Sequence, residues 1–120
     1  MLNLNSIMVG TTQPKIMAEF YSKVFGKQPD MTEGEWHGWQ IGSCFFSVGE
    51  HSEVTGKSET PARIMFNLET TDVKGEFVRI KELGADVVKE PYEMGPGWIA
   101  TFADPDGNYF QLMTPWDMNK

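Results

Sequence analysis

Few side chains in this sequence are of the types that carry out catalysis or bind metal ions. The chain has two histidines, His37 and His51, and a single cysteine, Cys44. Cys44 has no neighbouring histidine or cation in the sequence that would stabilise a thiolate, which predicts an inert, buried thiol. No Gly-x-Ser-x-Gly element, phosphate-binding loop or dinucleotide fingerprint occurs. The residue types therefore give little support to nucleophilic or cofactor-dependent catalysis.

The two histidines fall in Gly- or Ser-rich connections. Together with Glu35 and Glu50 they would supply the imidazole and carboxylate ligands that divalent metals prefer. Neither histidine, however, has a second histidine two or four residues away. We therefore expect solvated loop histidines, with a metal bound through His37, His51 and the nearby glutamates as the alternative.

The segment Asp104-Pro105-Asp106-Gly107-Asn108 is similar to the start of a calcium-binding loop. In that motif a glutamate closes the loop at its last position, where this chain has Pro115. The combination of Asp, Pro and Gly is typical of a tight turn between two strands. The segment therefore predicts a hairpin rather than a calcium site.

Composition excludes several classes of function. The 120 residues are 40% hydrophobic and 22% charged, enough for one folded domain with a proper core. A net charge of −7 argues against nucleic acid and anionic membrane surfaces as partners. One cysteine cannot form an internal disulfide, and no apolar stretch approaches the ~20 residues that span a bilayer. Since the first residues also lack a secretory signal, we expect a cytoplasmic protein.

The elements that must position any site occur in the same order twice. Apolar spacing predicts a strand over 4–9, a helix over 16–25 and short strands ending with 44–48. Pro14 suits the first turn of that helix, Thr11 or Thr12 its cap, and Gly26 its end. After a linker over 50–61 the second half repeats the pattern. Its expected elements are a strand over 63–68, a helix capped by Thr71 or Asp72 and ended by Gly84, and strands over 86–90, 98–102 and 109–113.

Landmarks in the two halves recur at nearly constant separations. Phe20 and Phe77 are 57 residues apart, Gly26 and Gly84 are 58 apart, and the final strands are 65 apart. Such spacing indicates an internal repeat. We predict a single α+β domain over 1–120, built from two βαβββ modules at about 1–50 and 61–115.

Three segments of the chain resemble the vicinal oxygen chelate superfamily, which includes glyoxalase I, bleomycin-resistance proteins and extradiol dioxygenases. They are Phe20-Tyr21, Leu83-Gly84-Ala85 and the segment from Phe102 to Asn108. The resemblance spans the whole chain. It implies a cupped mixed sheet with helices on its outer face, completed as a homodimer.

The resemblance also implies four metal-ligand positions, which fall on Ser6, Phe46, Arg63 and Gln111. Phenylalanine offers no lone pair and arginine is a permanent cation, while serine and glutamine are weak neutral donors. Such a set cannot hold a divalent ion. We therefore expect the fold without its metal centre, and no cofactor.

Strand alternation predicts which other side chains share the cup face. Trp98 is included among the predicted ligand-binding residues because it follows the Gly95-Pro96-Gly97 turn at the edge of the cup. Methionine and tryptophan are equally suited to core or dimer contacts, so each assignment has that alternative. The predicted ligand-binding residues are Ser6, Met8, Phe46, Arg63, Met65, Trp98, Tyr109, Gln111 and Met113.

Arg63 gives the most specific of these predictions, because a guanidinium in a partly apolar cup requires a partner for its charge. Either an acidic neighbour or an anionic or carbonyl-bearing ligand would supply it. The predicted function is a metal-free homodimer that sequesters or carries a small hydrophobic-aromatic molecule, with no nucleic-acid or membrane partner. The alternatives are a metal-dependent lyase or dioxygenase-like enzyme with non-standard ligands, and an interaction module with a collapsed cavity.

Overall fold

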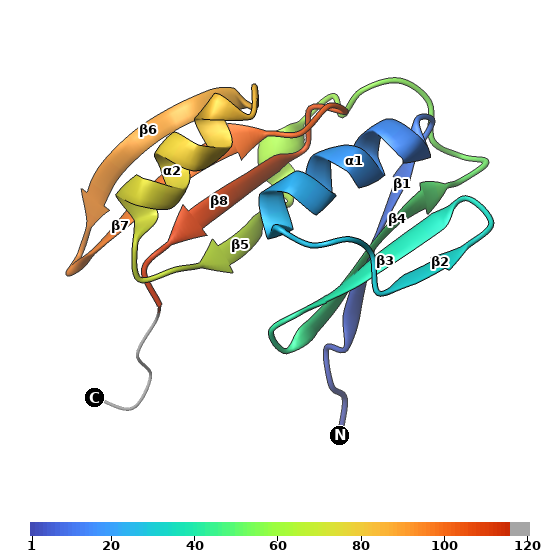
Figure 1. Ribbon diagram of the computed structural model, residues 1–120, viewed down its shortest axis with the longest axis horizontal. Helices are drawn as coiled ribbons and strands as arrows, with labels where there is room; N and C mark the ends of the chain where they lie inside the picture. Colours follow the sequence, from blue (N-terminus) through green and yellow to red (C-terminus); the bar gives the residue numbers. More distant parts are fainter. Residues whose placement is uncertain (116–120) are drawn as a thin grey trace. The chain divides into compact units, whose positions relative to one another are not determined.

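Two copies of one arrangement make up residues 1–115, the part of the chain that the computed structural model describes. The first lies in a compact unit, Met1–Gly56, and the second in a unit that begins at Lys57. Each unit holds a four-stranded mixed sheet and one α-helix, as Figure 1 shows. The predicted α+β class and the two βαβββ modules are confirmed. Trp116, whose role the sequence leaves open, lies outside the described residues.

Unit 1 has the strand order β1-β4-β3-β2, with β1 parallel to β4. Its helix begins at Pro14 and ends at Gly26, which adopts the left-handed conformation (φ 73°), as predicted. The predicted threonine cap is wrong. Gln13 occupies the cap position but its side chain makes no capping hydrogen bond to the helix, and the Thr11 hydroxyl oxygen accepts from the Gln13 N–H at 3.0 Å. The elements are β1 (Ser6–Thr11), α1 (Pro14–Phe25), β2 (Met31–Glu33), β3 (Trp36–Ile41) and β4 (Cys44–Glu50).

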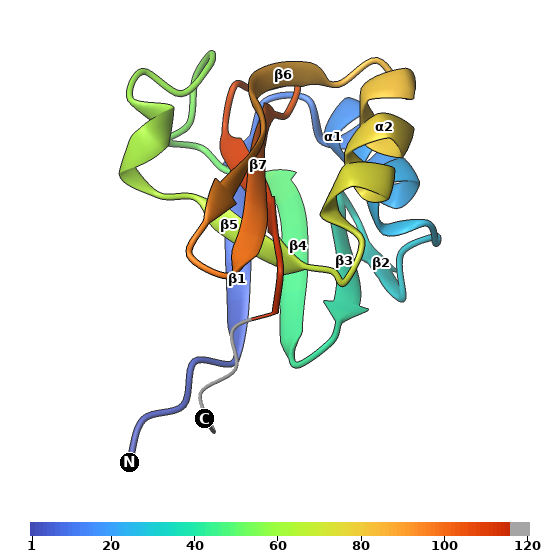
Figure 2. The same cartoon turned by 90° about the vertical axis from the view of Figure 1, so that its left-hand side faces the viewer.

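Unit 2 repeats this topology with the order β5-β8-β7-β6, and β5 is parallel to β8. Figure 2 shows its helix on one side of the sheet. Asp72 caps this helix as predicted, its carboxylate accepting from the Gly75 N–H at 3.0 Å. The elements are a short 3₁₀ helix η1 (Pro61–Arg63), β5 (Phe66–Glu69), α2 (Val73–Glu82), β6 (Asp86–Met94), β7 (Gly97–Ala103) and β8 (Tyr109–Met113).

Two predicted strands of unit 2 have different limits. The fifth strand begins at Phe66 rather than at residue 63, because Pro61 starts a 3₁₀ turn in which the Arg63 N–H donates to the Thr60 carbonyl at 3.1 Å. The sixth continues through Pro91 to Met94 instead of ending before it. As an edge strand it tolerates a proline, and a register shift between Lys89 and Tyr92 absorbs the lost donor.

One face of each sheet forms the core with the helix of its own unit. In unit 1 the Phe46 ring lies 4.8 Å from the Tyr21 ring and 5.5 Å from the Phe25 ring, between centroids. In unit 2 Phe102 stacks on Phe77 at 5.1 Å and on Phe110 at 5.6 Å. We call the opposite face of each sheet, which alternates with these residues, the open face of that unit. Within residues 1–115 no helix is long and apolar enough to cross a membrane.

The register corrects the repeat spacing. Ile7 pairs with Phe46 in unit 1, as Phe66 pairs with Phe110 in unit 2. By these core pairs the last strands are 64 residues apart, in place of the predicted 65. The first strands are 59 apart, two more than the 57 that separate Phe20 from Phe77. Because side chains alternate, an error of one residue in a strand moves a prediction to the opposite face.

Candidate functional site

The open face of unit 1 is hollowed into a pocket of about 470 Å³. All four strands of the sheet contribute side chains to it, and most of these are methionine or aromatic. Met8 is 67% exposed although it is apolar. The lining residues are Ser6, Met8, Met31, Glu33, Trp36, Phe45 and Ser47.

Strand register sets the arrangement of these side chains. Ser6 lies opposite Phe45, and Met8 lies opposite Ser47, on the parallel pair β1 and β4. On the other side of Ser47 stands Gly38 of β3, which pairs with Met31 of β2. Met8 and Met31 therefore flank the centre of the face.

Two glycines let aromatic rings lie against the floor of the pocket. A Cβ atom on Gly49 would overlap the Trp36 indole, and one on Gly38 would overlap the Phe45 ring. Neither glycine has a positive φ, so the close approach of a ring, and not backbone strain, accounts for glycine at both positions. The floor of the pocket is thus formed by the rings of Trp36 and Phe45, which lie directly on the backbone of the two glycines.

Replacing Gly49 with alanine is expected to push the Trp36 ring off the sheet. We expect the free energy of unfolding to fall by about 1–3 kcal/mol, as for other insertions of a methyl group into a packed position. Urea denaturation measures this. In a Trp36→Ala background the same substitution should cost less than about 1 kcal/mol, because the two residues are coupled through direct contact. Equal costs in both backgrounds would show that the indole does not occupy the space above Gly49.

The open face of unit 2 carries a row of hydrogen bonds across three strands. The Thr101 hydroxyl on β7 donates to the Gln111 Oε1 on β8 at 2.9 Å, and the Gln111 Nε2 donates to the Asn67 Oδ1 on β5 at 2.9 Å. Thr101 is buried, while Asn67 is exposed. The row fixes the orientation of the Gln111 amide and leaves the Asn67 NH₂ group without a hydrogen bond to any other residue in 1–115.

Five of the predicted site residues lie on the open faces that alternation assigns to them. Ser6 and Met8 line the unit 1 pocket. Tyr109, Gln111 and Met113 stand on β8, opposite the core side chains Phe110 and Leu112. Their participation in binding stays a prediction.

Phe46 is placed on the wrong face by the sequence. It is 6% exposed and packs under α1, so its neighbour Phe45 stands on the open face instead. Trp98 also lies on the core side of its sheet and not on the open face, where the sequence placed it. It alternates with the core residues Ala100 and Phe102, and its ring lies beneath Lys74 of α2, whose Nζ is 3.7 Å from the ring centroid.

Arg63 and Met65 are not on a strand. Arg63 ends the 3₁₀ turn with an exposed side chain, and Met65, 38% exposed, precedes β5. An exposed guanidinium is solvated by water, so it requires neither an acidic neighbour nor an anionic ligand. The premise of an Arg63-centred anion site, a guanidinium inside a partly apolar cup, is therefore not met by the described residues.

Sequence reasoning missed the residues that complete both open faces. Phe45 and Ser47 were detectable, since Ser47 interrupts the apolar run from Cys44 to Val48 and marks its own face as the polar one. Met31 and Glu33 gave no signal, because β2 has only three residues and is too short for periodicity. The sequence assigned no role to Trp36, which begins the six-residue strand β3. In unit 2 the missed residue is Thr101, whereas strand alternation does place Asn67 on the cup face.

The donor atoms of the open faces do not fit a divalent metal. The described lining of the unit 1 pocket offers the hydroxyls of Ser6 and Ser47, the thioether of Met8 and the single carboxylate of Glu33, and Asn67 and Gln111 in unit 2 offer amides. Neutral oxygens hold divalent ions only together with several carboxylate or imidazole ligands, and one carboxylate is too few. Within residues 1–115 no three His, Cys, Asp or Glu side chains come together.

The histidines have other partners. His37 lies on β3 and not in a loop, with its Nδ1 3.4 Å from the Thr32 hydroxyl. His51 follows β4, and its Nδ1 accepts from the Glu53 N–H at 3.1 Å. Cys44 is a half-buried free thiol at the start of β4. Neither imidazole is part of a metal-binding cluster of described residues.

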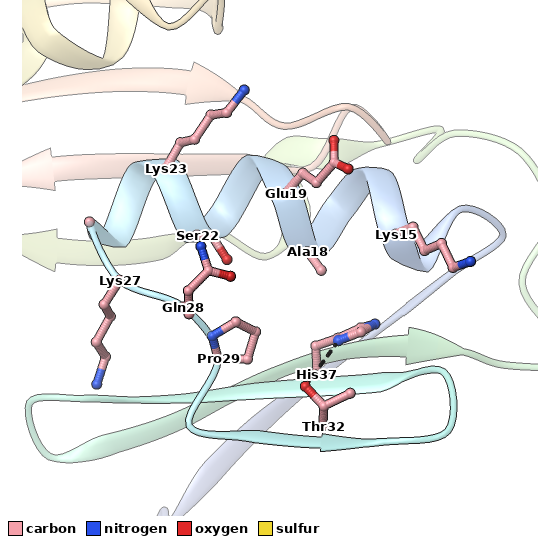
Figure 3. A pocket seen from close by; sticks show the side chains of 11 residues that line it. Lys15, Ala18, Glu19, Ser22, Lys23, Lys27, Gln28, Pro29, Thr32 and His37 are labelled. Atoms are coloured by element: carbon pink, nitrogen blue, oxygen red, sulfur yellow. Dashed lines mark hydrogen bonds between the residues drawn. The ribbon is translucent and has the colours of Figure 1, made fainter.

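A second hollow of about 670 Å³ lies on the helix side of unit 1, along α1 and the β2–β3 hairpin. Figure 3 shows that the lysines lining it, Lys15, Lys23 and Lys27, point in different directions. Lys27 is held by Asp30 at 2.7 Å, and this contact, with the Gln40 N–H, keeps the pKa of the Asp30 carboxyl below its usual value. Because its charges do not converge, this hollow is a weaker candidate than the open face.

Comparison with known proteins agrees with the architecture. Residues 6–113 match the family model of the glyoxalase-like domain. No curated protein sequence matches the chain significantly.

Solved structures share the fold at low sequence identity. A glyoxalase-related enzyme from Fulvimarina pelagi is 17% identical, with a TM-score of 0.78, over 96% of this chain and 89% of that one. A glyoxalase/bleomycin resistance protein/dioxygenase family enzyme from Burkholderia phytofirmans is 22% identical, with a TM-score of 0.77, over 94% and 98%. The fosfomycin resistance protein FosX from Listeria monocytogenes is 18% identical, with a TM-score of 0.67, over 97% and 93%.

Proposed function

The chain belongs to the glyoxalase-like domain family, and we propose that this member binds a small apolar or aromatic molecule without a metal ion. The observation that supports this most directly is the pocket on the open face of unit 1, where Met8, Met31, Trp36 and Phe45 surround a central serine. Small-molecule sites have this composition, largely apolar walls with a few placed polar groups.

Exposure of the pocket walls adds to the argument. Met8 keeps 67% of its surface exposed in the middle of an apolar face. Covering such a side chain contributes about 1–2 kcal/mol to the free energy of binding. A flat aromatic or aliphatic ligand lying on the rings of Trp36 and Phe45 would cover it.

The polar array of unit 2 supports a second type of contact. Thr101 holds the Gln111 amide in one orientation, so the donors of Gln111 and Asn67 are set before a ligand arrives. Donors held in this way favour binding because little entropy is lost on association. They suit a carbonyl or hydroxyl oxygen.

We also propose that the protein is a cytoplasmic homodimer. An apolar open face is the kind of surface that a second copy or a ligand covers. Analytical ultracentrifugation should give twice the 13.6 kDa mass of the chain at micromolar concentration. A monomer at all concentrations would contradict the dimer without affecting the binding proposal.

Ligand binding is tested by a thermal-shift screen of aromatic metabolites and antibiotics against the wild type and two variants. Met8→Gln changes the open face, whereas Ile16→Gln changes an equally apolar, 52% exposed residue of α1. We expect Met8→Gln to lower the affinity for the compounds found in the screen about tenfold, because it removes an apolar contact. Ile16→Gln should leave these affinities unchanged.

Metal removal separates this function from a metal-dependent lyase or dioxygenase-like enzyme. Binding should persist after dialysis against a chelator, because the described pocket lining offers one carboxylate, that of Glu33, and no imidazole. If the purified protein held one equivalent of zinc, iron, nickel or manganese, and binding depended on it, the metal-free proposal would be wrong.

A further inference from the structure

One charged side chain stands at the edge of the unit 1 pocket. Among the described residues that line it, Glu33 alone carries a charge. It lies directly opposite Trp36 in the β2–β3 ladder. Within residues 1–115 it forms no ion pair or hydrogen bond through its side chain, so its carboxylate is available to a ligand.

The Trp36 indole presents one face to the pocket. Its other face lies on Gly49, where even a methyl group has no room. Lysines of the described chain cover the rings of Trp98, Phe77 and Tyr92, but none covers Trp36. The π-electrons of an uncovered indole face attract a cation, and more strongly than those of any other side chain.

We infer that the ligand of the unit 1 open face is a cationic amine with an aromatic or apolar body, its nitrogen held between the Glu33 carboxylate and the Trp36 ring. The apolar body would then lie across Phe45 and Met8. This inference rests on the proposed function and adds the chemical class of the ligand.

Charge complementarity supports this choice over an anion. A carboxylate on the ligand would meet Glu33 with no cation in the pocket lining to offset it. The net charge of −7 also raises the local concentration of cations and lowers that of anions. A neutral ligand would gain from the apolar walls but not from Glu33.

Three probes of the same length isolate the charge: phenylpropylamine, phenylpropanol and phenylpropanoate, titrated by calorimetry or by NMR shifts of the full chain. We expect the amine to bind about tenfold more tightly than the alcohol, and the carboxylate to bind more weakly than either. Glu33→Gln should lower the affinity for the amine about fivefold and leave the affinity for the alcohol unchanged.

Glu35→Gln is the matched control. It makes the same change of charge two residues away, in the β2–β3 turn and outside the pocket lining, and should leave all three affinities unchanged. If the amine and alcohol bound equally, or if both glutamine variants reduced amine binding to the same extent, the inference would be overturned and the proposed function would stand. If none of the probes bound and the metabolite and antibiotic screen gave no hit, the proposed function would fail with it.

Discussion

Replacing Phe46 with alanine is expected to lower the free energy of unfolding by about 3–5 kcal/mol, the usual cost of removing a buried aromatic ring. The ring is 6% exposed and packs on Tyr21, Phe25 and Trp39. The change removes the centre of the unit 1 core and leaves a cavity under α1. Chemical denaturation followed by circular dichroism measures the effect.

Phe45→Ala provides the control, because it removes the same atoms from the adjacent residue on the opposite face. Its ring lies half-buried over Gly38 on the open face. We expect a cost of about 1–1.5 kcal/mol in stability and a clear loss of ligand affinity. If Phe45→Ala were the more destabilising of the two, the assignment of faces would be reversed, and Phe46 would be the residue that contacts the ligand.

The fold follows from the sequence because its signals are local. Pro14 and Gly26 bound the first helix, Asp72 caps the second, and the segment from Asp104 to Gly107 connects β7 to β8 as a tight turn. Where a local signal had two interpretations, prediction failed. Pro91 was taken as the end of a strand, although an edge strand with a register shift accommodates it.

The site was predicted less well, since it depends on register rather than on pattern. Spacing between repeats identified the last strands, but an offset of 65 in place of 64 selected Phe46 instead of Ser47 as the counterpart of Gln111. The polar Ser47, which shares its face with Phe45, marks the open face of this strand, but the repeat spacing pointed to Phe46. The prediction for Arg63 was wrong for another reason. Pro61 initiates a 3₁₀ turn at the position where the internal repeat predicts a strand.

The absence of a metal centre stays a prediction, but the residues from which it is argued change. The residue set proposed from the sequence included Phe46 and Arg63, which face elsewhere. The side chains that do stand on the open faces, such as Ser47 in unit 1 and Asn67 in unit 2, are mostly neutral, and Glu33 is the one carboxylate in the described lining of the unit 1 pocket. The argument against a divalent ion therefore rests on different residues but on the same chemistry.

Asp104→Ala is the second substitution for which a large effect is expected, about 3–4 kcal/mol in the free energy of unfolding. Asp104 is 2% exposed. Its Oδ1 accepts from the N–H groups of Asp106 and Asn108 at 2.9 and 3.0 Å, and its Oδ2 accepts from the Asn108 side chain at 3.0 Å. Alanine would leave three donors of a largely buried turn without this acceptor. Urea denaturation gives the change.

Asn108→Ala is the control for this substitution, since it removes only the Asn108 side-chain donor and should cost about 1 kcal/mol. Because the Asp104 carboxylate is already committed to donors within its own turn, calcium should not raise the melting temperature of the wild type. A calcium-dependent rise that Asp104→Ala abolished would mean that the segment binds the ion. In that case the carboxylate would serve a ligand, and its hydrogen bonds to the turn would be secondary.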